Sequence, residues 1–316
     1  MNVVTSAKIR RDLREALINE FPNAVFSFHS NIRDAATRLK DADILITYGE
    51  DLTDSIINAA ENLKWIMVIS AGLDLMPFDA INKKGILVTN AKGIHKIPMA
   101  EYTLGMMLQY VKRLRTFDLN QREHKWDKAV KTSELAGKRI TIIGPGAIGG
   151  EIARLAKAFR MTTAGVNRSG HPIENIDQIY LNSNLLDALK DADFVVSVLP
   201  STKETYHLIN KTHFQAMKQD AVFINIGRGK TVDQRDLLEA LKEGMISHAI
   251  LDVFEKEPLN EEHPFWKMDQ VTLTPHISSI SSEYQPRSID IFKENLSKYL
   301  AGENDYINKI DLEKGY

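Results

Sequence analysis

The chain has 316 residues, which is long enough for two domains that each bury a core. With 43% hydrophobic and 26% charged residues, the composition is that of a soluble globular protein, not a disordered or fibrous one. The net charge of −2 leaves no excess of cations for binding nucleic acid, and the absence of cysteine excludes disulfides, thiolate metal sites and a cysteine nucleophile.

The first third of the sequence alternates short β-branched or apolar runs with amphipathic stretches, which is typical of βα units on a parallel sheet. Strands are expected at 24–28, 43–47, 65–69 and 86–89, and helices at 7–19, 32–39 and 54–62. A longer helix is expected at 97–114, where the apolar centre AEYTLGMMLQYV indicates burial. We therefore expect a small open α/β domain that ends before this helix.

From Lys138 the alternation starts again and predicts a doubly wound parallel sheet. Its strands are expected at 138–143, 162–166, 194–199, 221–226, 249–253 and 271–274, and its first helix at 147–159. Residues 115–132 are expected to form a polar connecting arm, and 284–300 has a helical period. The long buried helix at 97–114 suits a junction between the two domains.

The segment RITIIGPGAIGGEIARLAKAF contains a GxGxxG motif, directly after an apolar strand and at the start of a helix. The first glycine permits a tight turn, the second lets a pyrophosphate approach the backbone, and the third lets helix and strand pack closely. The phosphates then meet free N–H groups at the positive end of the helix. The motif predicts a dinucleotide site whose residues are Gly144, Gly146, Ala147, Ile148 and Gly149.

The end of the next strand predicts which nicotinamide cofactor is bound. An acidic residue roughly 20 positions after the glycine motif would bind the free ribose 2′-hydroxyl of NAD. This sequence instead has Asn167, Arg168 and Ser169, and an arginine beside hydroxyl and amide groups can bind a 2′-phosphate. We therefore expect NADP(H) to be preferred, while NAD(H) stays an alternative if Arg168 only faces solvent.

Three residues in the last third of the chain have the chemistry to reduce a 2-oxo acid: Arg228 in NIGRG, Glu257 in DVFEKEP and His276 in TPHIS. The planar guanidinium of arginine can hold both oxygens of a carboxylate, which the ammonium of lysine cannot. Histidine can deliver the proton that accompanies hydride transfer, because its pKa lies nearest neutrality. A carboxylate on the imidazole favours its charged form, so Glu257 would keep His276 loaded with that proton.

The order and the motifs of these residues resemble the D-isomer-specific 2-hydroxyacid dehydrogenase family, from Tyr48 to Tyr284. The resemblance implies a Rossmann dinucleotide-binding domain of residues 96–284 and a smaller flavodoxin-like substrate domain of residues 1–95 with 285–316, to which the chain returns near its end. It implies a homodimer that uses the arm 115–132. It also implies that Arg228 binds and polarises the 2-oxo acid, that His276 is the acid/base and that Glu257 pairs with it. The other residues that it places beside the cofactor are Leu199, Pro200, Ile226 and Gly227, with Asp252 near the nicotinamide carboxamide.

The segment from Ser70 to Asp74 follows a strand at its carboxyl end, where open α/β sheets bind ligands. Gly72, which has no Cβ, would allow successive N–H groups to converge on an anion. In the family that this chain resembles, the same segment contacts the substrate carboxylate. Ala71 and Gly72 are therefore assigned to the substrate together with Arg228 and His276, and the alternative is a simple tight turn.

The NRS signature and the closing INKIDLEKGY resemble the glyoxylate/hydroxypyruvate reductase branch of the family. We therefore expect an enzyme that uses NADPH to reduce glyoxylate, hydroxypyruvate or another small 2-oxo acid to the D-2-hydroxy acid. The alternative from another class is a nucleotide-sensing binding protein, because transcriptional corepressors that resemble this family keep the same three residues.

The sequence also predicts which partners are absent. The remaining histidines form no HxH or HExxH spacing, so no metal is expected. The start lacks the apolar stretch of a signal peptide, and no later run is long enough to cross a membrane. We therefore expect a cytoplasmic protein without a membrane or nucleic-acid partner.

Overall fold

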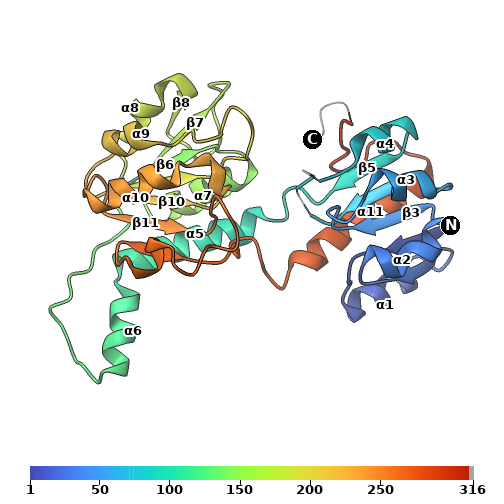
Figure 1. The fold of residues 1–316 in the computed structure, drawn as a ribbon, viewed down its shortest axis with the longest axis horizontal. Coiled ribbons are helices and arrows are strands. Elements are labelled where there is room, and N and C mark those ends of the chain that lie inside the picture. The colour runs from blue at the N-terminus through green and yellow to red at the C-terminus, as the bar shows by residue number, and fades with distance from the viewer. Residues whose placement is uncertain (71, 74, 313–316) are drawn as a thin grey trace. The chain divides into compact units, whose positions relative to one another are not determined.

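The computed structural model describes residues 1–70, 72–73 and 75–312, and the chain divides into two compact units (Figure 1). The first unit comprises Met1–His95 and Ser281–Tyr316, and the second comprises Lys96–Ile280. The chain thus returns to the first unit at residue 281, next to the expected return at residue 285. Within the described residues, no helix is long and apolar enough to span a membrane.

The first unit has a five-stranded parallel sheet in the order β2-β1-β3-β4-β5, which is the strand order of flavodoxin. Its strands are β1 (Asn2–Thr5), β2 (Val25–Phe28), β3 (Ile44–Thr47), β4 (Trp65–Val68) and β5 (Leu87–Asn90). Its helices are α1 (Arg11–Glu20), α2 (Ile32–Leu39), α3 (Asp54–Ala59), α4 (Phe78–Lys83) and α11 (Tyr284–Ala301). The predicted flavodoxin-like α/β fold is confirmed.

The C-terminal helix α11 completes the core of the first unit. Trp65 of β4 is fully buried, and its indole Nε1 donates a hydrogen bond of 2.9 Å to Oγ1 of Thr89. Its ring stacks on Phe292 and Tyr299 of α11, with centroid separations of 5.3 and 5.6 Å. Because aromatic side chains bury a large apolar area, these contacts explain why residues after 281 fold with the first 95.

The second unit has a seven-stranded parallel sheet in the order β12-β11-β10-β9-β6-β7-β8. Counted from β6, this is the Rossmann order with one strand added, so the predicted doubly wound fold is confirmed. Its strands are β6 (Arg139–Ile143), β7 (Thr162–Asn167), β8 (Gln178–Leu181), β9 (Phe194–Ser197), β10 (Val222–Asn225), β11 (His248–Leu251) and β12 (Val271–Leu273). Its helices are α5 (Lys96–Val111), α6 (Leu114–Arg122), α7 (Ala147–Ala158), α8 (Leu185–Leu189), α9 (Lys211–Ala216) and α10 (Gln234–Lys242).

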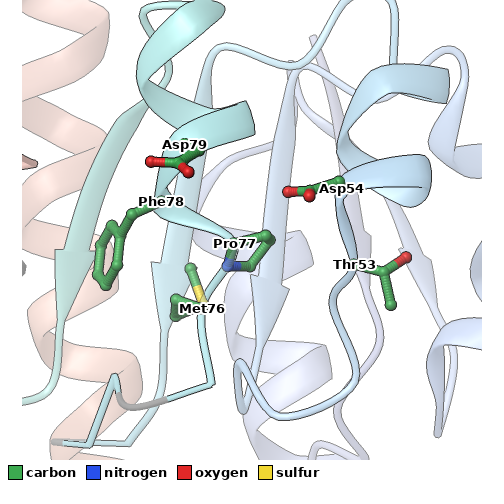
Figure 2. Close-up of a pocket in the computed structure, with 6 residues that line it drawn as sticks. All are labelled: Thr53, Asp54, Met76, Pro77, Phe78 and Asp79. Atoms are coloured by element: carbon green, nitrogen blue, oxygen red, sulfur yellow. The ribbon is translucent and has the colours of Figure 1, made fainter.

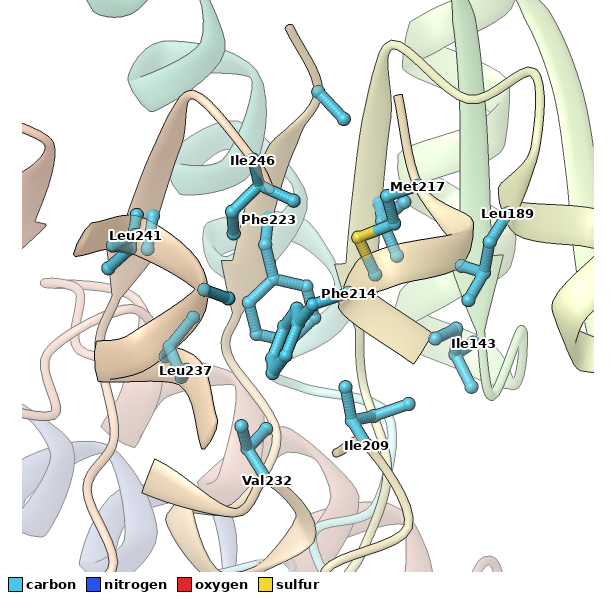
Figure 3. Close-up of a cluster of buried hydrophobic side chains, with 14 of the residues drawn as sticks. Ile143, Leu189, Ile209, Phe214, Met217, Phe223, Val232, Leu237, Leu241 and Ile246 are labelled. Atoms are coloured by element: carbon cyan, nitrogen blue, oxygen red, sulfur yellow. The ribbon is translucent and has the colours of Figure 1, made fainter. Parts of the chain in front are cut away.

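Two apolar clusters cover the two faces of the second sheet. One joins β6, β9 and β10 to α8, α9 and α10, and Figure 3 shows its side chains between the sheet and these helices. At its centre the rings of Phe214 and Phe223 meet edge to face, 5.5 Å apart. The other cluster packs α5 and α7 against the opposite face. With both faces covered, the polar site must lie at the ends of the strands.

Among the described residues, the structure contains seven α-helices and strands that the sequence patterns did not predict: β1, α4, α6, β8, α8, α9 and α10. Strands β1 and β8 are only four residues long, and β8 is a half-exposed edge strand without a clear apolar face. The expected helix 97–114 ends at Val111, and Arg113, with φ of +54°, separates it from α6. The predicted connecting arm therefore begins with a helix.

Candidate active site

The sheet of the second unit brings the predicted site residues together at one edge. The glycine motif follows β6, Leu199 follows β9, Arg228 follows β10, Asp252 follows β11 and His276 follows β12. All these strands are parallel, so their carboxyl ends meet at the same edge. The strand order reverses between β6 and β9, which is where doubly wound sheets bind dinucleotides.

The glycine loop has the shape that a pyrophosphate requires. Gly144 has φ of +84°, and a Cβ there would lie 3.2 Å from Cδ2 of Leu199. A Cβ on Gly149 would lie 2.9 Å from Cγ2 of Ile142, so this glycine allows α7 to pack on β6. A Cβ on Gly146 would meet no protein atom within 4 Å, which leaves open space at the start of α7. The loop therefore fits a dinucleotide phosphate approaching the helix N-terminus.

The residues after β7 form an exposed turn. Oδ1 of Asn167 accepts a hydrogen bond of 2.6 Å from the Gly170 amide, while Arg168 and Ser169 are exposed. The guanidinium of Arg168 acts on Glu204 in the loop after β9. The pKa of Glu204 lies below its usual range, first because Thr202 donates a hydrogen bond to it and also because of the charge of Arg168. Arg168 is thus exposed to solvent, and its charge acts on Glu204.

Arg228 lies between two glycines whose backbones pack closely against other segments of the chain. A Cβ on Gly227 would come within 2.5 Å of the Leu199 carbonyl oxygen, and a Cβ on Gly229 within 1.9 Å of the Phe254 carbonyl carbon. Only glycine fits such close backbone approaches. The exposed Arg228 side chain donates from Nη1 to the Gly227 carbonyl, 2.9 Å away. The two glycines therefore fix the backbone on both sides of the guanidinium.

Glu257 and His276 are in direct contact. Oε2 of Glu257 lies 2.8 Å from Nδ1 of His276, and the two side chains are 36% and 44% exposed. Oε1 of Glu257 accepts a hydrogen bond of 3.0 Å from the Phe254 amide, which anchors the carboxylate to the segment after β11. The pair is thus accessible to a ligand while one partner is held by the backbone.

The buried carboxylate of Asp252 holds the loop that carries His276. Its Oδ1 accepts hydrogen bonds from Oγ1 of Thr274 at 2.6 Å and from the Ile277 amide at 2.9 Å, and Oδ2 accepts one from the Ser278 amide at 2.9 Å. The His276 amide donates to the Asp252 carbonyl at 2.8 Å, and His276 has φ of +55°. These bonds explain how a non-glycine residue keeps this uncommon backbone conformation.

A tyrosine extends this network, and the sequence reasoning missed it. The hydroxyl of Tyr102 on α5 lies 2.5 Å from Oγ1 of Thr274, and burial raises the pKa of Tyr102 to about 12. Thr274 begins the TPHIS segment, but Tyr102 belongs to no motif and lies 172 positions away in the chain. The family resemblance predicts Asp252 near the nicotinamide carboxamide. In the structure, the hydrogen bonds of its carboxylate hold the loop that carries His276.

The substrate residues predicted in the first unit are described only in part. Ala71 and Asp74 lie outside the described residues. Oγ of Ser70 donates to the carbonyls of Tyr48 and Gly72, at 3.2 and 3.1 Å, and Gly72 is exposed. The convergence of N–H groups at Gly72 stays a prediction.

A separate pocket of about 510 Å³ in the first unit has the wrong charge for a 2-oxo acid. It is lined by Thr53, Asp54, Met76, Pro77, Phe78 and Asp79, and Figure 2 shows these side chains, two of which are carboxylates. Two carboxylates would repel an anionic substrate. The pocket is therefore not part of the site built from the glycine loop, Arg228 and His276.

Comparison with known proteins identifies the family. The profile of the family described as "D-isomer specific 2-hydroxyacid dehydrogenase, NAD binding domain" matches residues 104–278. The chain belongs to the D-isomer specific 2-hydroxyacid dehydrogenase family. It is 38% identical to a glyoxylate reductase from Thermofilum pendens, over 84% of this chain and 80% of that protein. It is also 36% identical to a D-3-phosphoglycerate dehydrogenase from Methanocaldococcus jannaschii, over 84% of this chain and 51% of that protein.

Solved structures of this dehydrogenase family match over the whole chain. A family member from Aeromonas salmonicida has a TM-score of 0.88 and 31% identity, covering 98% of this chain and 99% of that one. An NADPH-dependent glyoxylate/hydroxypyruvate reductase from Sinorhizobium meliloti, in complex with NADP and sulfate, has a TM-score of 0.79 and 25% identity, covering 100% and 99%. The predicted class, an NAD(P)-dependent 2-hydroxyacid dehydrogenase, is confirmed.

The substitution Asp252→Asn tests whether the hydrogen bonds of this carboxylate support the His276 loop. In Asp252→Asn, an amide N–H replaces one acceptor oxygen and faces a backbone N–H, so the His276 loop loses part of its support. Leaving such a buried donor unpaired costs about 1–3 kcal/mol, which corresponds to a fall of about 5-fold to 150-fold in kcat where the whole cost falls on the transition state. Steady-state kinetics measure this fall. Asp220→Asn, at a side chain that is 72% exposed, is the control and should leave kcat unchanged. An unchanged kcat in Asp252→Asn would show that the loop does not depend on this carboxylate.

Proposed function

We propose that this dehydrogenase reduces a small 2-oxo acid of the glyoxylate or hydroxypyruvate type to the D-2-hydroxy acid, with NADPH as hydride donor. The observation that carries the proposal is the contact between Glu257 and His276 at the sheet edge that also carries Arg228 and the glycine loop. Relatives named glyoxylate reductase support the substrate class. The bound cofactor would supply the hydride, and the side chains of the chain would supply orientation and the proton.

Each of the three side chains has one task in this proposal. Arg228 holds the carboxylate of the 2-oxo acid with its fork of N–H donors and polarises the adjacent carbonyl. His276 donates a proton to the carbonyl oxygen from Nε2, because Nδ1 faces Glu257. Glu257 orients the imidazole through its contact with Nδ1. Backbone N–H groups at Ala71 and Gly72 are proposed as further donors to the substrate carboxylate.

The proposed cofactor site extends along the ends of β6, β7, β9 and β10. The N–H groups of the first turn of α7 would bind the pyrophosphate, and Arg168 with Asn167 and Ser169 would bind the 2′-phosphate. The residues proposed to flank the cofactor are Leu199, Pro200, Ile226, Gly227 and Asp252. The charge of Arg168 contributes to the lowered pKa of Glu204, so Glu204 would compete with the phosphate for that charge. We expect Glu204 to moderate the preference for NADPH.

A second copy of the chain is the proposed partner. Figure 1 shows α6 and the segment after it reaching away from the sheet of the second unit. This segment exposes large apolar side chains: Leu114 at 51%, Phe117 at 38%, Leu119 at 49% and Trp126 at 88%. Such a patch favours a protein interface. Light scattering measures the mass in solution, and the mass of a single chain would reject the dimer.

A panel of substrates and cofactors tests the proposed reaction. With glyoxylate or hydroxypyruvate, kcat/KM for NADPH should exceed that for NADH by about 10-fold to 100-fold, because Arg168 would form a charged hydrogen bond with the 2′-phosphate. Arg168→Ala should abolish this preference, and Glu204→Gln should increase it. Equal values in the wild type would reject the NADPH assignment. Turnover of D-3-phosphoglycerate but of neither small 2-oxo acid would reject the substrate class.

The acid role of His276 has its own test. His276→Gln keeps a side chain that can form hydrogen bonds but cannot deliver a proton, so kcat should fall by about 10²-fold to 10⁴-fold. NADPH fluorescence should give an unchanged Kd, since the glycine loop is intact. A variant with wild-type kcat would remove His276 from the mechanism.

A further inference from the structure

A second charged cluster lies next to the candidate active site, and the proposed reaction gives it no role. His207 lies between two carboxylates: its Nδ1 is 3.3 Å from Oδ2 of Asp233, and its Nε2 is 3.1 Å from Oε1 of Glu255. The three side chains are 29%, 28% and 34% exposed. They come from three segments, which follow β9, precede α10 and follow β11. His207 therefore connects parts of the chain that are distant in sequence.

Each ring nitrogen of His207 faces a different carboxylate. A neutral ring has one N–H, so one of its two nitrogens would present a lone pair to a carboxylate. A ring with two N–H groups can donate to Asp233 and Glu255 at the same time, and it offsets their repulsion. One possible ligand atom from each of the three residues lies within 4.8 Å of the other two, so the cluster could also surround a cation. A cation would bind only one ring nitrogen, however, whereas here each nitrogen faces its own carboxylate.

The backbone around His207 is bonded to the segment that carries Arg228. The His207 amide donates to the Lys230 carbonyl at 2.9 Å, and the Ile209 amide donates to the Thr231 carbonyl at 3.0 Å. His207 has φ of +49°, a conformation that non-glycine residues adopt rarely. The ring of Tyr206 stacks on the imidazole with a centroid separation of 4.0 Å. These contacts hold the ring in one position.

Glu255 connects the same cluster to Glu257. Its Oε1 also accepts a hydrogen bond of 2.8 Å from the Gln234 amide, and its own amide donates to Oε1 of Gln234 at 3.3 Å. Two residues later, Glu257 contacts His276. Gly229, the neighbour of Arg228, packs directly on the backbone of Phe254 and Glu255. The cluster therefore joins the Arg228 segment to the Glu257 segment.

We propose that His207 is a positioning residue for 2-oxo acid reduction. By bridging Asp233 and Glu255 it fixes the segment of Arg228 relative to the segment of Glu257, and so it sets where the guanidinium meets the substrate carboxylate. This inference rests on the proposed roles of Arg228 and of the Glu257–His276 pair.

The first test combines kinetics with hydrogen–deuterium exchange of the full-length protein. His207→Ala should raise KM for the 2-oxo acid by about tenfold or more, because a small displacement of an orienting group has a large effect on rate and binding. The Kd for NADPH should stay within about twofold, since the glycine loop makes none of these bonds. Exchange should become faster in the peptides that contain 228–234 and 254–257.

The matched control is His213→Ala. His213 follows in the same part of the chain, and within the described residues its ring bonds to Asn210 at the start of α9. This variant should change neither the KM for the 2-oxo acid nor exchange in the two segments. Glu255→Gln should resemble His207→Ala, and the double variant should lose no more than either single variant, because the two residues act as one unit.

Several outcomes would overturn the inference. Unchanged exchange in His207→Ala would mean that the bridge does not hold the segments, whatever the activity. Faster exchange with an unchanged KM would mean that the bridge has no effect on substrate. Saturable stabilisation of the wild type by Zn²⁺, absent from His207→Ala, would identify a cation site instead. If the wild type reduces no 2-oxo acid, the proposed function fails, and the exchange experiment still decides whether the bridge exists.

Discussion

The candidate site depends on one close approach between two backbone segments. Gly229, next to Arg228, lies so near the backbone of Phe254 that any Cβ would overlap it. This contact joins the segment after β10 to the segment after β11, and from the second segment the Phe254 amide reaches the carboxylate of Glu257. Arg228 and Glu257 are 29 residues apart in the chain, so this contact assembles the site.

The buried and exposed polar groups around this contact have different tasks. Asp252 is fully buried, and its carboxylate accepts hydrogen bonds that hold the loop of His276. Such groups act on the backbone, because a buried charge must have its hydrogen bonds satisfied. The side chains that would act on a ligand are accessible to it. Glu257 and His276 are 36% and 44% exposed, and Arg228 is exposed. The site thus combines a rigidly held loop with functional side chains that a ligand can reach, as preorganisation requires.

Much of this arrangement could be predicted from the sequence, because local patterns carry it. The glycine motif between an apolar strand and a helix, and the strand ends that carry Arg228 and His276, follow from periodicity and from motifs. The bridge of His207 and the support of Thr274 by Tyr102 could not be predicted, since they join residues far apart without any repeating pattern. Strand β8 was missed because its sequence lacks a buried face. The sequence therefore did not predict contacts between polar side chains that are far apart in the chain.

The most direct test of this account is kcat/KM of Gly229→Ala with NADPH and the best 2-oxo acid substrate. The added methyl group would separate the segments of Arg228 and Glu257, so we expect a loss of at least about 100-fold, with NADPH still bound and circular dichroism unchanged. Gly150→Ala is the control, because a Cβ there meets nothing within 4 Å. A Gly229→Ala enzyme with wild-type kcat/KM would contradict the claim that this backbone contact assembles the site.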